Sequence, residues 1–104
     1  MADNEAEGDR IAKVLGDYNC MMMGNHGVTV IGNSIAEAFE DLYYLERACR
    51  NLVLAYQTGQ PLNIMSDIVA ERTAQGWDSV RGAAQCHFDQ YKLLLDRQDP
   101  SYAE

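Results

Sequence analysis

The residues of this chain best suited to chemistry lie in one short turn, Gly24-Asn25-His26-Gly27. His26 is one of only two histidines, and it stands between two apolar runs, 20–23 and 28–31. Glycine adopts backbone conformations that other residues avoid, so Gly24 and Gly27 can fix the direction of the imidazole. A histidine held in this way can bind a metal or transfer a proton near neutral pH. The alternative is a local hydrogen bond that only shapes the turn.

The apolar runs on either side of the turn predict two buried strands, at about 19–23 and 28–31. Neither run alternates polar with apolar residues, and continuous apolar strands are typical of a sheet that is covered on both faces. Only a few residues separate the two runs, so an antiparallel hairpin is the natural connection. The pattern therefore predicts an α/β fold in which helices cover a short apolar sheet.

A long helix follows the hairpin, and Ser34 with Glu37 forms a capping box at its start. Apolar residues recur at helical spacing until Gly59 and Pro61 end the helix. At about 24 residues it is roughly twice as long as the mean helix. Its aromatic surface exceeds what one core face requires, which indicates a contact with another subunit. The tyrosines expected at this interface are Tyr43, Tyr44 and Tyr56.

The remaining sequence is also helical. A short helix is predicted from Asn4 to Leu15, a second begins at about residue 66, and a last one covers about 78–97. Trp77, beside a glycine, is expected to anchor this tail. Since there are no repeats, low-complexity tracts or linkers, the prediction is one domain over 1–104, with 66–104 as a helical tail.

Composition limits the classes of function. The 104 residues include 16 acidic and 8 basic ones, which give a net charge of −8. Such a charge repels nucleic acid and anionic membrane surfaces, so neither is expected as a partner. No run approaches the roughly 18 apolar residues of a membrane-spanning helix, and the acidic start is unlike a secretory leader. The three cysteines form neither a metal-like pair nor a disulfide framework, which favours a cytoplasmic location.

These blocks together resemble the class II aldolase/adducin family. The resemblance is strongest over 19–61, where an Asn-His-Gly turn lies between apolar strands and Gly32 follows Gly27 by five residues. The long helix, with Tyr-Tyr-Leu-Glu at 43–46, continues the match. The last segment, 67–103, is similar to the helical tail of many bacterial members.

The resemblance implies the C-terminal part of a three-layer class II aldolase-like domain, helix-rich overall. Family members hold a divalent metal, usually zinc, with three histidines: two from a His-x-His pair and one from the Asn-His-Gly turn. By this match His26 is the third metal ligand, and Gly24, Asn25 and Gly27 support it. The implied metal, zinc or manganese, polarises a carbonyl so that a neighbouring carbon–carbon bond can break. The implied reactions are aldol cleavage of sugar phosphates and related decarboxylations.

The chain departs from the family pattern at the metal pair. It contains no His-x-His, because its two histidines, His26 and His87, are 61 positions apart. The upstream half of the domain, which carries the metal pair and the general base, has no counterpart in this sequence, so no catalytic residue is assigned. Catalytic zinc sites use three protein ligands, and one imidazole does not complete such a site.

Three hypotheses therefore stay open from the sequence. The chain belongs to a metal-dependent lyase that is incomplete alone, and a partner chain supplies the missing N-terminal half. Alternatively, it is a non-catalytic, adducin-like oligomerisation module that forms a homo-oligomer, or it is a truncated remnant. The implied metal is bound in the first case and absent in the others.

Overall fold

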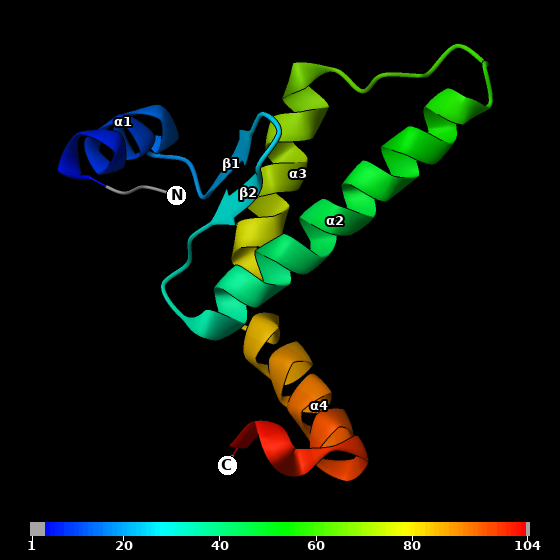
Figure 1. The fold of residues 1–104 in the computed structure, drawn as a ribbon. Coiled ribbons are helices and arrows are strands. Elements are labelled where there is room, and N and C mark those ends of the chain that lie inside the picture. Colours follow the sequence, from blue (N-terminus) through cyan, green and yellow to red (C-terminus); the bar gives the residue numbers. More distant parts are fainter. Residues whose placement is uncertain (1–3, 104) are drawn as a thin grey trace.

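The computed structural model describes residues 4–103, which form a small hairpin and several helices (Figure 1). In chain order the elements are α1 (Glu5–Leu15), β1 (Cys20–Met23), β2 (Gly27–Val30), α2 (Ile35–Gln57), α3 (Asp67–Ser79), α4 (Ala83–Gln98) and the short 3₁₀ helix η1 (Pro100–Ala103). The prediction of a helix-rich α/β chain with short antiparallel strands is confirmed. Between residues 4 and 103, no helix is long and apolar enough to cross a membrane.

The backbone of the hairpin turn accounts for its residue types. The strands pair antiparallel, with Met23 opposite Gly27, and the backbone N–H of His26 donates to the carbonyl of Met23 at 3.2 Å. Asn25 has a φ of 59° at the third position of this turn, where a type II turn requires a positive value. Gly27 has a φ of 137°, which residues with a side chain rarely adopt. The turn therefore holds His26 at the tip of the hairpin.

The start of α2 explains how the chain turns from the hairpin into the long helix. Ser34 Oγ accepts a hydrogen bond from the backbone N–H of Glu37 at 3.2 Å, as the capping box predicts. The Glu37 carboxylate reaches back to the backbone N–H of Asn33, at 3.1 Å, rather than to Ser34. A Cβ at Gly32 would lie 2.8 Å from the backbone nitrogen of Ala38. Glycine is therefore required at this close approach.

Helix α2 is the element to which the others attach. It contacts β2 near its start and α4 along the same half, while α1 contacts only β1. Helices α2 and α3 have no backbone contact within the described residues, and Figure 1 shows them diverging toward the connector 58–66. The far half of α2 is consequently left without a neighbouring element.

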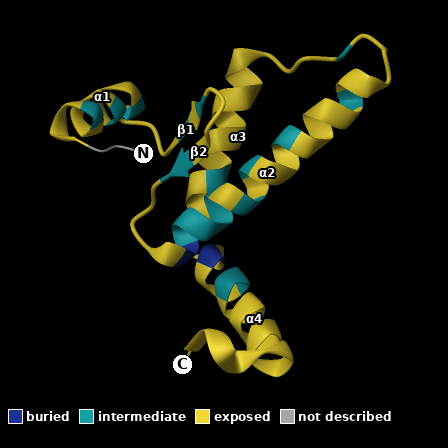
Figure 2. Ribbon diagram, viewed as in Figure 1, coloured by how far each residue is buried: buried dark blue, intermediate teal, exposed yellow. Residues whose placement is uncertain are grey.

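Few residues are buried within the part of the chain that the structure describes. Of the residues described, only Ala36 and Ala84 are buried, each 3% exposed, and most of the ribbon in Figure 2 is exposed. The prediction that the strands are covered on both faces is wrong for this chain alone, since Met22 is 65% exposed and Val28 is 37% exposed. The physical reason is that the helices cover one face of the hairpin, since residues along β1 are alternately exposed and partly buried.

The dimensions of the chain agree with this slight burial. The Cα radius of gyration is 17.1 Å, whereas a compact domain of this length has about 13 Å. The accessible surface is 8805 Å², about 3,000 Å² more than the roughly 5,800 Å² expected for a compact monomer of this mass. The chain thus presents a large excess of surface to its surroundings.

Candidate functional site

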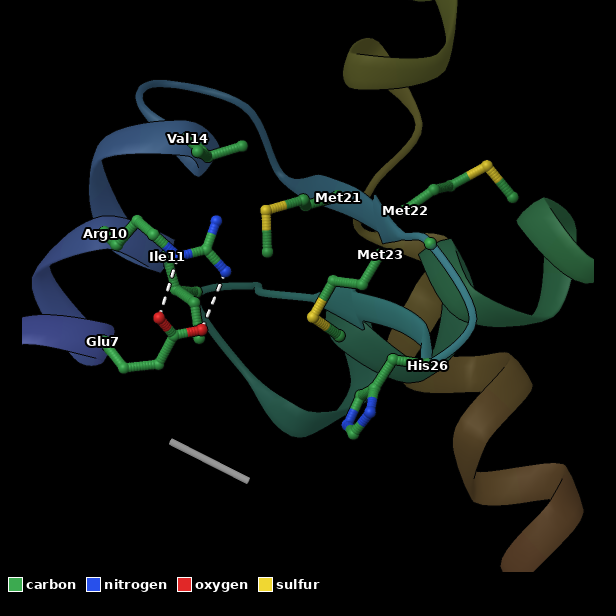
Figure 3. A pocket seen from close by; sticks show the side chains of 9 residues that line it. Glu7, Arg10, Ile11, Val14, Met21, Met22, Met23 and His26 are labelled. Carbon is green, nitrogen blue, oxygen red and sulfur yellow. Dashed lines mark hydrogen bonds and ion pairs between the residues drawn. The ribbon is translucent and has the colours of Figure 1, made fainter. Parts of the chain in front are cut away.

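His26 borders a hollow between the hairpin and α1 (Figure 3). The hollow has a volume of about 390 Å³. Figure 3 shows the imidazole projecting from the hairpin tip, while the charged side chains come from α1 on the opposite side. The lining residues are Glu7, Arg10, Ile11 and Val14 from α1, and Met21, Met22, Met23, Gly24 and His26 from the hairpin.

The two charged groups of this hollow already bind each other. Arg10 Nη2 and Nε donate to the two carboxylate oxygens of Glu7 at 2.7 and 2.8 Å. These hydrogen bonds lower the pKa of Glu7 below its ordinary value and raise the pKa of Arg10. Because the guanidinium occupies both carboxylate oxygens, Glu7 is poorly placed to act as a general base or as a metal ligand.

The imidazole of His26 is exposed, and it makes no hydrogen bond to any group between residues 4 and 103. Within that same range, no three His, Cys, Asp or Glu side chains are grouped so that they could hold a metal ion. A metal site needs three or more protein donors. The residues described here therefore do not fit a complete metal site, and His26 fits one only as a single ligand.

The second histidine lies elsewhere, at the junction of α2 with α4. His87 Nδ1 contacts the carboxylate of Glu40, and both side chains are largely buried, 25% and 12% exposed. The ring of His87 packs edge-to-face against Tyr43 and Tyr91, with centroids 4.8 and 5.0 Å apart. Phe39 completes this aromatic cluster. His87 thus fastens α4 to α2, away from the hollow beside His26.

A polar network at the end of α3 attaches that helix to α2. Arg81 Nη1 contacts Asp41 of α2 at 3.0 Å, and Arg81 Nε contacts Asp78 at 3.0 Å. Hydrogen bonds to Asp78 and Asp41 raise the pKa of Arg81. Trp77 Nε1 donates to Asp41 at 3.4 Å, and its ring packs edge-to-face on Tyr44. The predicted anchoring role of Trp77 is confirmed.

The structure brings together only part of the set of residues singled out from the sequence. Gly24, Asn25, His26 and Gly27 share one turn. Tyr43 and Tyr44 pack within the chain, against the α4 cluster and Trp77 respectively. Tyr56 lies 64% exposed on the far half of α2. An interface role for the three tyrosines stays a prediction.

Sequence reasoning missed the Glu40–His87 and Asp41–Arg81 pairs. The two residues of each pair are 47 and 40 positions apart in the sequence. Taken singly, each of them looks like an ordinary solvent-exposed residue of a helix. Glu40 and Asp41 lie in the same stretch of α2 as Tyr43 and Tyr44. The one sequence signal for these pairs was a carboxylate beside aromatic residues on the same helix. A carboxylate in such apolar surroundings needs a hydrogen-bonding or charged partner.

Comparison with known proteins supplies the family. The model of the family described as "Class II Aldolase and Adducin N-terminal domain" matches residues 1–53 of this chain. The chain is 30% identical to a protein of Caulobacter vibrioides named for the class 2 aldolases, over all of this chain and 41% of that protein. A similarly named protein of Pseudomonas aeruginosa is 27% identical, over all of this chain and 42% of that protein.

A further relative is the "Meiotically up-regulated gene 14 protein" of Schizosaccharomyces pombe. It is 41% identical over 44 residues, which are 42% of this chain and 17% of that protein. No solved structure matches the chain. The chain belongs to the class II aldolase/adducin family. It spans about two fifths of the length of the two bacterial relatives.

Proposed function

We propose that His26 is one metal ligand of a lyase site of the class II aldolase type. Residues of another polypeptide complete this site. The observation that carries the proposal is the setting of His26. The ring stands exposed at the tip of a turn that has a positive φ at Asn25 and at Gly27, and no group between residues 4 and 103 forms a hydrogen bond with it. A histidine retained only to shape the turn would use a ring nitrogen locally.

The rest of the proposal follows from family membership. A divalent metal ion in such a site supplies Lewis-acid polarisation of a carbonyl next to the carbon–carbon bond that breaks. The proposed reaction is aldol cleavage of a sugar phosphate or a related decarboxylation, and the three free cysteines support a cytoplasmic site. Because the hollow offers one histidine, and its one carboxylate, Glu7, is held by Arg10, we expect no turnover by this chain alone.

The experiment is a metal measurement on the chain in its own assembly. A tagged chain is purified from the cells that make it, together with whatever it assembles with, and zinc and manganese are counted per chain. We expect near-stoichiometric metal in the wild type and its loss in His26→Ala. His87→Gln is the matched control, because it changes the other histidine and keeps a side chain that can hydrogen-bond Glu40.

Two results would overturn this proposal. One is metal that persists in His26→Ala, which would mean that the imidazole is no ligand. The other is a folded assembly without metal in the wild type. That second result would support the alternative functions, a non-catalytic adducin-like oligomerisation module or a truncated remnant.

A further inference from the structure

Arg10 has an unused hydrogen-bonding edge in the hollow beside His26. Its Nε and Nη2 donate to the carboxylate of Glu7 at 2.8 and 2.7 Å. A guanidinium carries five N–H donors in a planar fork, so this pairing leaves the Nη1 side of the group without a partner among residues 4–103. The two N–H groups of such an edge match the two oxygens of a carboxylate or phosphate. Arg10 can therefore bind a second anion while Glu7 holds the guanidinium in place.

Arg10 and His26 line opposite sides of this hollow. Figure 3 shows the guanidinium on α1 and the imidazole at the hairpin tip, with the side chains of Met21 and Met23 between them in this view. The volume of about 390 Å³ lies within the range of small-molecule sites. One molecule that fills the hollow therefore contacts both sides.

The side chains between these two groups are apolar. Met21 and Met23 are the partly buried residues of β1, and Ile11 and Val14 line the hollow from α1 (Figure 3). Among the lining residues that the structure describes, no side chain carries a hydroxyl or an amide. Burying a hydroxyl without a hydrogen-bond partner costs free energy. These walls consequently favour a hydrocarbon portion of a ligand over a sugar.

We propose that Arg10 binds the anionic end of the substrate, and that the part of the substrate next to this anion is apolar. This inference rests on the proposed function, in which the metal ion held by His26 takes the carbonyl end. The anion is a carboxylate or a phosphate, since the free edge of Arg10 suits either. Of the substrate classes implied for the family, the hollow therefore favours an acid with few hydroxyls over a sugar phosphate.

NMR titration of the ¹⁵N-labelled chain tests the binding of the anion directly, because it observes the Arg10 Nε–H group. With hexanoate we expect saturable shifts at Arg10 and at residues 21–23. Gluconate is the matched ligand, since it has the same number of carbons and a carboxylate but is rich in hydroxyls. It should bind at least about fivefold more weakly. Hexyl phosphate shows which anion the site prefers, and saturable binding of either alkyl anion at Arg10 supports the proposal.

Substitutions on α1 separate the donor edge from the charge. Arg10→Gln should weaken the binding of hexanoate by about tenfold, because it removes a charged hydrogen-bonding group. Arg10→Lys keeps the charge but has no planar fork, so it should weaken binding nearly as much. Lys13→Gln is the matched control. It removes one positive charge from an exposed position of the same helix, outside the hollow, and should leave binding unchanged.

Three results would overturn the inference. The first is the absence of saturable shifts with both alkyl anions, and the second is equal weakening by Lys13→Gln, which would indicate a diffuse attraction by charge. The third is gluconate that binds as tightly as hexanoate. The metal count is a separate measurement, because Arg10→Gln should keep the metal that His26→Ala loses. Hexanoate bound at Arg10 in a chain whose assembly holds no metal would support the anion site and contradict the proposed function.

Discussion

The two histidines of this chain show how the same side chain can have opposite settings. His26 is exposed at the tip of a turn, and none of the residues from 4 to 103 bonds to its ring. His87 is largely buried, contacts Glu40 and packs within an aromatic cluster. The setting of His26 suits a ligand for something outside the chain, and the setting of His87 suits the attachment of one helix to another.

The first prediction concerns stability at these two positions. His87→Ala should lower the free energy of unfolding by about 1–3 kcal/mol, because it leaves the carboxylate of Glu40 largely buried without its partner. His26→Ala should stay within about 0.5 kcal/mol of the wild type, as is usual for exposed residues. Urea unfolding followed by circular dichroism, at one fixed protein concentration, measures both.

A double-mutant cycle isolates the pair. If the Glu40–His87 contact is the cause, His87→Ala should cost much less in a Glu40→Gln background than in the wild type. Equal costs in the two backgrounds would contradict the argument and would assign the loss to aromatic packing with Tyr43 and Tyr91.

Helix caps act at the scale of elements, and this chain offers a matched pair of serines. Ser34 accepts a hydrogen bond at the start of α2, whereas Ser66, at the start of α3, makes no such bond. We therefore predict that Ser34→Ala lowers the free energy of unfolding by about 1 kcal/mol, and that Ser66→Ala changes it by a few tenths at most. Thermal unfolding of both variants checks this, and equal losses would contradict it.

Most elements could be predicted from local sequence, because their signals are local. Asn4 and Ser34 cap the helices they were expected to cap, and the hairpin pairs around Asn25 as its turn residues predict. The exposure of Met22 could not be predicted in this way. An apolar strand shows that a cover is needed, but its sequence does not show which polypeptide supplies that cover.

The same limit applies to the site and to the arrangement of α2 and α3. The turn that presents His26 is encoded by its own four residues, so the candidate ligand was visible from the sequence. Gly59 and Pro61 correctly indicate where α2 ends, but the direction in which α3 then departs depends on Trp77 and Arg81 meeting Asp41, 36 and 40 positions away. Such contacts between distant elements leave no periodic signal.

For the whole molecule, slight burial has a calorimetric consequence. By the usual scaling of folded and unfolded surface, this chain removes from water about three quarters of the area that a compact chain of equal mass removes. The heat-capacity change of unfolding should fall in proportion, to about 1 kcal/mol/K instead of about 1.4. Scanning calorimetry of the chain measures it, and the full value would contradict the extended shape.

The order of contacts along the chain also determines how quickly it can fold. Within residues 4–103, most contacts between elements join consecutive ones: α1 with β1, β1 with β2, β2 with α2, and α4 with η1. In that range only the α2–α4 contact skips an element. Chains with such local contacts fold fast, because little loop entropy is lost before each contact forms. During synthesis the hairpin and α2 can therefore assemble before α4 has left the ribosome. We therefore expect the contact of His87 with Glu40 to form after the contacts between consecutive elements.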